Sequence, residues 1–298
     1  MPKFAPVFII LAAALWGVDG VLLRPYLYNL PVSLVVFIES GIVILILSPL
    51  FIRRFDELKS LTKSDWISFF FVALLGGAIG TMSITKALFY VNYVNLSIVV
   101  LMQKLQPVFA ILLASVILKE KLKKNFLGWA SLAMIGAYLM TFGLSIPNLG
   151  TGNKTAIAGM YALIAAISFG ASTVISKRAL RNVGFGAATY LRFLFATIIL
   201  SVVAVVSGNI SAITSVSFDQ LLIFLLIAFS TGGAAIFLYY YGLKNVTASV
   251  ATICELAFPL TAVLLEYFLR DNILSFVQWG GVFFLFIAII QITRLRKS

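Results

Sequence analysis

The sequence predicts an all-α integral membrane protein with ten transmembrane helices, arranged as two inverted five-helix repeats. Three observations support this: an apolar composition, ten apolar segments of spanning length, and a match between the two halves of the chain. Of the 298 residues, 62% are hydrophobic and 11% are charged, and the mean hydropathy is +1.09. A soluble domain is typically about 45–50% apolar and about 25% charged, so we expect lipid around this chain.

Ten apolar segments each approach the length of about 20 residues that a membrane-spanning helix needs. In chain order they cover residues 4–23, 32–52, 66–88, 95–118, 126–145, 156–177, 185–206, 218–241, 247–269 and 275–293. Little sequence is left between them, so we expect short loops and no separate soluble domain.

Positive charge alternates along the chain. Most of the 22 Lys and Arg residues lie at the amino terminus and in every second predicted loop, as in the run Lys119, Lys121, Lys123 and Lys124. Arg24 falls near a helix end in one of the other, charge-poor loops. The positive-inside rule then predicts an inner-membrane, multi-pass protein with both termini in the cytoplasm. A net charge of +12 that is spread over such loops indicates membrane orientation and not nucleic-acid binding.

The residue types that are scarce exclude several kinds of site. The chain has one cysteine, Cys254, and no histidine. A disulfide framework and a thiolate metal site are therefore excluded, and the commonest metal ligand and general base is absent. We expect no metal, no cofactor and no catalytic residues.

The two halves of the chain repeat each other. Shifted by 152 positions, "NLSIVVLMQKLQPVFAILL" (95–113) aligns with "TASVATICELAFPLTAVLL" (247–265) without a gap, and Pro107 aligns with Pro259. Near the start, a shift of 153 places "AALWG" (13–17) on "AISFG" (166–170). We predict two repeats, residues 1–147 and 153–298. An odd number of helices per repeat inverts the second relative to the first, a pattern common in secondary transporters.

These features give the chain a family resemblance. The segments "LWG" (15–17), "ALFYVNYVNLSIVVLMQKLQPVFAILLASVILKEKL" (87–122) and "LKNVTASVATICELAFPLTAVLL" (243–265) resemble the EamA-type members of the drug/metabolite transporter superfamily. The resemblance implies a 5+5 helical fold, and export or exchange of small metabolites by alternating access. It does not name a substrate. Members of the family usually carry a basic residue in both the second and the seventh helix; this chain has Arg192 in the seventh but Glu39 in the second.

Five ionisable residues fall inside the apolar segments. Each costs roughly 2.5–3.5 kcal/mol at a helix centre, so it is expected to face protein or a water-filled cavity. The repeat relates Glu39 to Arg192, and relates Gln103, beside Lys104, to Glu255. We therefore expect the first, second, fourth, seventh and ninth helices to line one central cavity. The five residues are Asp19, Glu39, Lys104, Arg192 and Glu255.

The depth of these residues suggests two clusters beside a site at the membrane midplane. Asp19, Glu39 and Lys104 would lie on the outer side, with Lys104 balanced by Glu39 or Asp19. Arg192 and Glu255 would lie on the inner side. The three acids exceed the two bases by one carboxylate. This surplus predicts proton coupling, with Asp19 or Glu39 as carrier, or a substrate ammonium group that supplies the missing charge, as in an amino acid or a similar zwitterion.

Other polar and aromatic residues complete the candidate site. Gln103 is the repeat partner of Glu255, Trp16 shares a helix face with Asp19, and Tyr190 is a candidate for the cavity wall. Pro107 and Pro259 each remove a backbone hydrogen bond in mid-helix, which predicts a hinge in each repeat or a kink that only shapes packing.

The sequence thus predicts a secondary transporter of a small metabolite and not an enzyme. Three alternatives remain: a membrane-embedded enzyme, a channel, or a sensor protein in which the buried charges are structural ion pairs. The substrate, the direction of transport, the coupling ion and the oligomeric state are left open.

Overall fold

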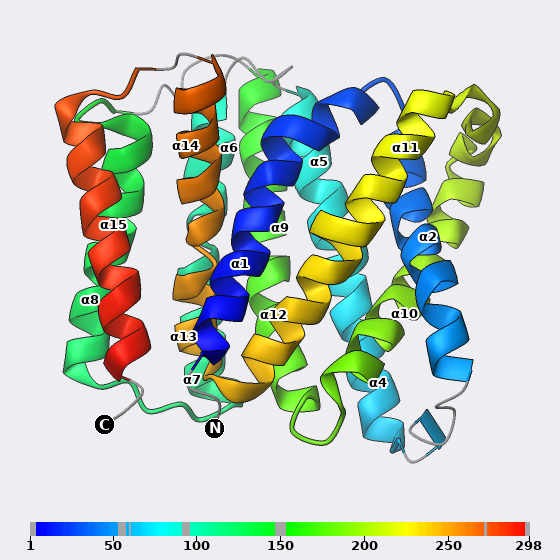
Figure 1. Cartoon of the computed structure of the whole chain (residues 1–298), viewed down its shortest axis with the longest axis horizontal. Coiled ribbons are helices and arrows are strands. Elements are labelled where there is room, and N and C mark those ends of the chain that lie inside the picture. The colour runs from blue at the N-terminus through cyan, green and yellow to red at the C-terminus, as the bar shows by residue number, and fades with distance from the viewer. Residues whose placement is uncertain are drawn as a thin grey trace.

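The computed structural model describes residues 4–52, 58–59, 61–90, 96–146, 153–270 and 273–295. Every regular element in these ranges is a helix. The helices run side by side between two ends of the molecule (Figure 1). We call the end at which α1 begins and α15 ends the terminal end, and the opposite one the far end.

Ten segments, numbered 1 to 10 in chain order, build the fold. Segments 1 to 5 are, in turn, α1 (Ala5–Val18) with the π-helical turn η1 (Asp19–Leu23) and the 3₁₀ turn η2 (Arg24–Leu27); α2 (Val32–Ile52); α4 (Lys63–Val72), η3 (Ala73–Ile79) and α5 (Gly80–Tyr90); α6 (Leu96–Gln103) and α7 (Gln106–Ile117); and α8 (Lys124–Phe142).

The second half continues in the same order. Segments 6 to 10 are α9 (Asn153–Ala179); α10 (Phe185–Val206), followed by the 3₁₀ turn η4 (Asn209–Ser215); α11 (Phe218–Ile227), η5 (Ala228–Gly232) and α12 (Gly233–Asn245); α13 (Ala248–Cys254) and α14 (Ala257–Arg270); and α15 (Phe276–Leu295). The predicted boundary between the repeats falls at residues 147–152, outside the described residues, and it stays a prediction.

The ten-helix membrane fold is confirmed. In the described part of the chain, nine helical stretches are long and apolar enough to cross a membrane. The exception is segment 4, whose apolar part, Leu101–Ile117, is shorter. The observed segments agree with the predicted ones except at their ends; segment 8, for example, runs to Asn245 and not to residue 241.

Irregularities inside the helices recur in both halves. Segments 3 and 8 each contain a π-helical stretch, η3 and η5, and each begins with a capping box, Thr62 with Asp65 and Ser217 with Gln220. Segments 4 and 9 are each interrupted. The first helices of the two halves run in opposite directions, because α1 leaves the terminal end and α9 returns to it (Figure 1). The halves are therefore inverted repeats.

Helix packing follows the same symmetry. α1 packs on α12 and α14, and its counterpart α9 packs on α5 and α7. α2 packs on α10, and α8 packs on α15 at one edge of the molecule. The matched glycines explain part of this pattern. A Cβ atom added to Gly17 would lie 2.8 Å from Thr261 Cβ, and one added to Gly170 would lie 3.0 Å from the Ala110 nitrogen.

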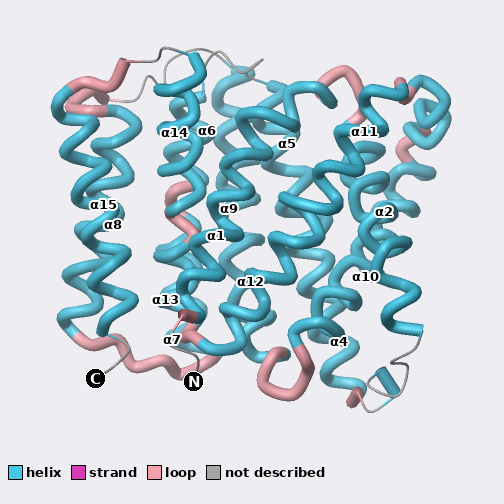
Figure 2. The backbone as a smooth tube through the Cα atoms, viewed as in Figure 1, coloured by secondary structure: helices cyan, strands magenta, loops and turns pink. Residues whose placement is uncertain are grey.

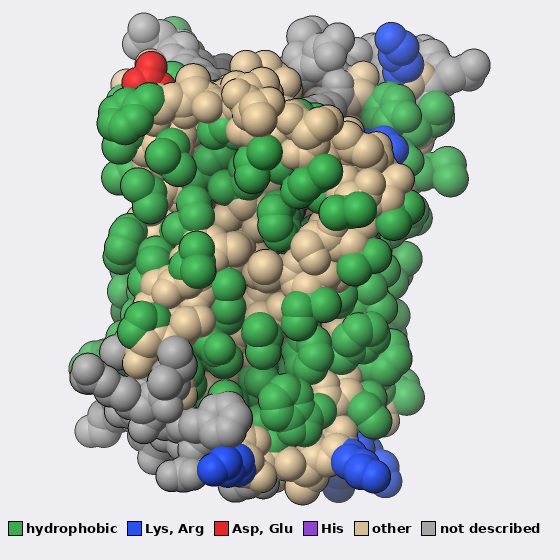
Figure 3. Space-filling view, turned by 90° about the vertical axis from the view of Figure 1, so that its right-hand side faces the viewer, with side chains coloured by type: hydrophobic (Ala, Val, Ile, Leu, Met, Phe, Trp, Pro, Cys, Tyr) green, Lys and Arg blue, Asp and Glu red, His purple; other side chains and the backbone are tan. Residues whose placement is uncertain are grey.

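The sides of the molecule are apolar. Figure 3 shows hydrophobic side chains over the middle of one side, with Lys and Arg near the two ends. Large apolar side chains such as Leu45, Val116 and Val206 are more than 70% exposed. In water such a surface would be unfavourable, whereas lipid covers it.

Candidate functional site

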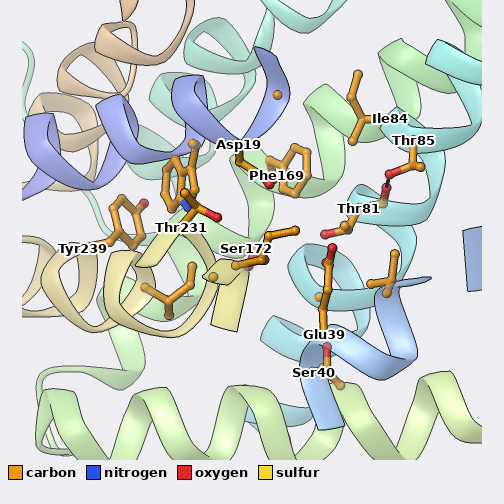
Figure 4. A pocket seen from close by; sticks show the side chains of 18 of the residues that line it. Asp19, Glu39, Ser40, Thr81, Ile84, Thr85, Phe169, Ser172, Thr231 and Tyr239 are labelled. Atoms are coloured by element: carbon orange, nitrogen blue, oxygen red, sulfur yellow. Dashed lines mark hydrogen bonds between the residues drawn. The ribbon is translucent and has the colours of Figure 1, made fainter. Parts of the chain in front are cut away.

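A cavity of about 280 Å³ lies inside the bundle, close to the size of small-molecule sites, about 300–1,000 Å³. Eight of the ten segments line it; α8 and α15 contribute no residue. This confirms the predicted contribution of segments 1, 2, 4, 7 and 9 and adds segments 3, 6 and 8. In Figure 4, Asp19, Thr231 and Tyr239 lie on one side of the cavity, and Glu39, Thr81 and Thr85 on another.

The interruptions of segments 4 and 9 reach this cavity. Segment 4 turns at Lys104 and Leu105, and segment 9 turns at Glu255 and Leu256. In each case a proline follows within three residues, Pro107 and Pro259. Because proline has no backbone N–H, it cannot donate to the carbonyl four residues earlier, that of Gln103 or of Glu255. The breaks lie at mid-height, where Figure 2 draws a loop segment between α13 and α14. A hinge role for the two prolines stays a prediction.

Segments 1 and 2 carry a buried three-residue ion cluster. Arg24 Nη2 lies 2.7 Å from Asp19 Oδ2 and 3.2 Å from Glu39 Oε1. The π-helical turn η1 lies between Asp19 and Arg24, and Arg24 also donates from Nε to Asp19 at 3.0 Å. The hydrogen bond from Arg24 Nη2 to Glu39 goes to Oε2, at 3.3 Å. Asp19 Oδ1 and Glu39 Oε1 are buried and accept no hydrogen bond from a described residue.

The position of Arg24 corrects one prediction. Arg24 was expected near a helix end in a charge-poor loop, because it follows the predicted apolar segment 4–23. The structure buries its guanidinium between two carboxylates. The central cavity is lined by three acids and two bases, so one carboxylate is in excess, as predicted: Asp19, Glu39, Glu255, Arg24 and Arg192. Proton coupling stays a prediction.

Lys104 does not join the predicted outer cluster. Its ammonium donates to the Ala137 carbonyl and to Thr141 Oγ1, both on α8, and it lies 5.6 Å from the centre of the Phe142 ring. Within the described residues no carboxylate is paired with it. The prediction that Glu39 or Asp19 balances the charge of Lys104 is wrong. The turn after α6 directs Lys104 to segment 5, and Arg24 is the base that pairs with the two carboxylates.

Glu255 is held by three neutral donors. Its carboxylate accepts from Gln106 Nε2 at 2.6 Å, from Tyr239 Oη at 2.6 Å and from Thr173 Oγ1 at 3.4 Å. Arg192 donates instead to Tyr240 Oη at 3.4 Å. No ion pair joins Arg192 to Glu255 in the described structure, although both residues line the cavity. The predicted inner pair therefore consists of two separately bonded groups.

The remaining predicted residues divide between the cavity and its surroundings. Trp16 lines the cavity, and its ring centre lies 5.4 Å from that of Tyr239. Gln103 also lines the cavity. Tyr190 does not; its ring stacks on that of Phe51 with 4.8 Å between centres. Its assignment to the cavity wall is wrong, because it lies on a different face of α10 from Arg192.

Sequence reasoning missed the hydroxyl groups of the cavity. They come from segments 2, 3, 6 and 8 and are isolated polar residues in apolar helices: Ser40, Thr81, Thr85, Ser172, Thr173, Ser176 and Thr231. The inverted repeat could have indicated them, because a cavity lined by segments 1 and 2 requires segments 6 and 7 as well. Gln106, which donates to Glu255, was also missed, although it lies in segment 4, a segment predicted to line the cavity.

A second cavity of about 390 Å³ adjoins the first. The two share wall residues that include Gly20, Gln103, Glu255 and Phe258. The second cavity reaches Pro25 and Tyr28, near the far end, and Pro107, Pro259 and Lys104 also line it. The second cavity thus adjoins the central cavity and extends from it toward the far end.

At the terminal end the helices are tied together. Glu120, in the loop after α7, accepts hydrogen bonds from the backbone nitrogens of Ala248 and Ser249 and from Ser249 Oγ, at 2.6–3.1 Å. It therefore caps the start of α13. Lys177 donates to the carbonyls of Leu243 and Lys244 at the end of α12.

Comparison with known proteins gives a consistent result. The model of the EamA-like transporter family matches residues 3–142 and again residues 156–294. A riboflavin transporter, ImpX, of Fusobacterium nucleatum is 43% identical over 287 residues, which are 96% of each chain. An uncharacterized transporter of Synechocystis is 27% identical over 271 residues, covering 87% of this chain and 74% of that one. A crystal structure with 15% identity superposes with a TM-score of 0.75 over 98% of this chain and 96% of the other, which shows the shared fold.

Proposed function

Because the chain belongs to the EamA-like transporter family, we propose that it carries riboflavin, or a closely similar hydroxylated aromatic heterocycle, across the cell membrane. Membership of the family makes the chain a multi-pass membrane transporter of a small metabolite and not an enzyme. The name of the Fusobacterium relative supplies the substrate of the proposal, and the chemistry of the cavity supports it.

Riboflavin is uncharged at neutral pH and has two contrasting parts. One is a flat fused-ring system that ends in a pyrimidinedione; the other is a chain of hydroxyl groups. Aromatic side chains suited to the ring line the central cavity, namely Trp16, Phe169, Phe193, Tyr239 and Phe258. Hydroxyl groups suited to the chain come from segments 2, 3, 6 and 8. Such a mixture of apolar walls with a few placed polar groups is typical of sites for small molecules.

The single observation that carries the proposal is the way the cavity's carboxylates are occupied. Asp19 and Glu39 share Arg24, and Glu255 is bonded by three neutral donors. The ammonium group of an amino acid would have to approach carboxylates that already have these internal partners. A neutral substrate does not disturb them, and it can use the hydroxyls, the free amide and the rings.

Alternating access is the proposed mechanism. Two inverted repeats that differ in conformation can exchange conformations, so that the cavity opens first to one side and then to the other. The tie between Glu120 and α13 at the terminal end, together with the second cavity that extends toward the far end, supports a state that is closed at the terminal end. Following the positive-inside rule, we place that end in the cytoplasm and the protein in the inner membrane. Export or exchange stays the predicted direction.

Transport by purified protein in liposomes tests the proposal. We expect saturable uptake of labelled riboflavin, acceleration by riboflavin preloaded inside (counterflow), and competition by flavin analogues but not by amino acids. Leu45→Ala, a change at a 72% exposed position, serves as control and should transport normally. Saturable uptake of an amino acid without uptake of riboflavin would overturn the substrate proposal. Repeating the assay with and without a pH gradient tests proton coupling.

A further inference from the structure

We infer that Gln103 determines substrate specificity, and that its side-chain amide recognises the pyrimidinedione edge of the substrate ring. The inference rests on the proposed function, because it assigns one part of the proposed substrate to one residue. The evidence for it is a difference in hydrogen bonding between Gln103 and Glu255, which the repeat places at equivalent positions.

Gln103 and Glu255 occupy matching places in the two interrupted segments. Gln103 is the last residue of α6, and Glu255 directly follows the last residue of α13. Both line the central cavity and the second cavity. Each precedes by four residues the proline of its own segment, Pro107 or Pro259. The fold therefore presents both side chains at the midplane, where the two cavities adjoin.

The two side chains are used differently. The Glu255 carboxylate is saturated by donors from three other segments, through Gln106, Tyr239 and Thr173. The Gln103 side chain makes no hydrogen bond with any described residue, and it is half-buried in the cavity wall. The amide nitrogen of Gln106, three residues further on, is already bonded to Glu255. Gln103 thus offers the unoccupied carboxamide between the two cavities.

A carboxamide matches the edge of a pyrimidinedione. It presents one acceptor and one donor side by side, and the ring edge presents an N–H group beside a carbonyl. Two parallel hydrogen bonds can form, as they do when glutamine reads the edge of adenine. Neighbouring wall residues suit the ring itself, because Phe258 lines both cavities as Gln103 does.

Blocking the ring N–H tests the inference without changing the protein. N3-methylriboflavin keeps the fused rings and the hydroxyl chain but cannot donate from the imide. In wild-type liposomes we expect its half-saturation concentration to be roughly 10- to 100-fold higher than that of riboflavin, since two hydrogen bonds are disturbed. Equal transport of the two compounds by wild-type protein would overturn the inference.

Two variants complete the test. Gln103→Leu should raise the half-saturation concentration for riboflavin by a similar factor and should transport both compounds about equally. Gln106→Leu, the matched control, should lower transport of both compounds while keeping the preference for riboflavin. Discrimination that persists in Gln103→Leu would overturn the inference and leave the proposed function intact. Failure of the wild type to transport riboflavin would instead overturn the proposed function.

Discussion

The guanidinium of Arg24 lies 3.2 Å from the carboxylate of Glu39, so the end of segment 1 is joined to the middle of segment 2 inside the bundle. Asp19 approaches the same guanidinium from one π-helical turn earlier. A single base thus serves two acids that line the central cavity. The cluster holds two acids and one base, and all three residues belong to the first half of the chain.

Removing the shared base should be more damaging than removing an exposed one. We expect Arg24→Met to lower the free energy of unfolding by about 3–5 kcal/mol, because two buried carboxylates lose their partner. Thermal unfolding of the purified protein measures this. The unfolding free energy of Arg24→Lys should lie between those of wild type and Arg24→Met, since an ammonium group cannot bond two carboxylates as a guanidinium does. Lys86→Met, which removes a cation from the Tyr161 ring, should cost about 1 kcal/mol or less. Equal stability of Arg24→Met and wild type would contradict the structural role of the cluster.

The cap that Glu120 provides should control access to α13. Loss of an N-terminal cap costs about 1 kcal/mol, so Glu120→Ala should shift the population of states open at the terminal end roughly fivefold. Cys254, the single cysteine of the chain and fully buried, reports this shift through its rate of reaction with a membrane-permeant maleimide. The exposed Asp219, in the first turn of α11, gives the control Asp219→Asn, which should label as slowly as wild type. Unchanged labelling in Glu120→Ala would show that this contact does not restrain α13.

The two prolines at the helix breaks should affect the rate of transport. Pro107→Ala and Pro259→Ala each restore one backbone donor, worth about 0.5–1.5 kcal/mol, and favour a straight helix. We expect a fall in the maximal rate by up to roughly tenfold, with a smaller change in the half-saturation concentration. Pro49→Ala alters a proline in α2 that is exposed on the outside of the bundle, and it should leave transport unchanged. If all three variants transport alike, the breaks shape packing and do not act as hinges.

Lys104 should influence stability more than substrate binding. Its ammonium is bonded to Ala137 and Thr141 of α8, so Lys104→Met removes a link between segments 4 and 5. It also removes a charge whose insertion costs roughly 2.5–3.5 kcal/mol, and the two effects oppose each other. We expect a net change in unfolding free energy within about 2 kcal/mol and nearly normal uptake of riboflavin. Complete loss of uptake in a stable Lys104→Met protein would place Lys104 in the substrate site.

Much of the architecture could be predicted from the sequence. Composition and apolar segments define the ten helices, and the alignment of Pro107 with Pro259 reveals that segments 4 and 9 correspond. Six of the residues proposed for the site line one cavity: Trp16, Asp19, Glu39, Gln103, Arg192 and Glu255. Their shared location could be predicted because a charge inside lipid must face protein or water, and because the repeat relates one side of the cavity to the other.

Pairing of the charges could not be predicted in the same way. A π-helical turn after Val18 extends segment 1 as far as Leu27, and this brings Arg24 inside the bundle instead of into a loop. The turn after Gln103 directs Lys104 to α8. Both outcomes depend on local departures from α-helical geometry, and hydrophobic periodicity does not encode these. The face of α10 that Tyr190 occupies likewise depends on the rotation of that helix against α2.

The inverted repeat also has a thermodynamic consequence. If the two halves were identical, exchanging their conformations would give a molecule of the same free energy, and the two orientations would be equally populated. The halves differ in their buried ionic groups, since Arg24 holds Glu39 in one half while the counterpart of Glu39 is Arg192 in the other. This difference removes the degeneracy. The resting orientation of the empty protein therefore depends on positions where the repeats differ, the buried ionic groups among them. Substitutions there change the equilibrium constant between the two orientations before any substrate binds.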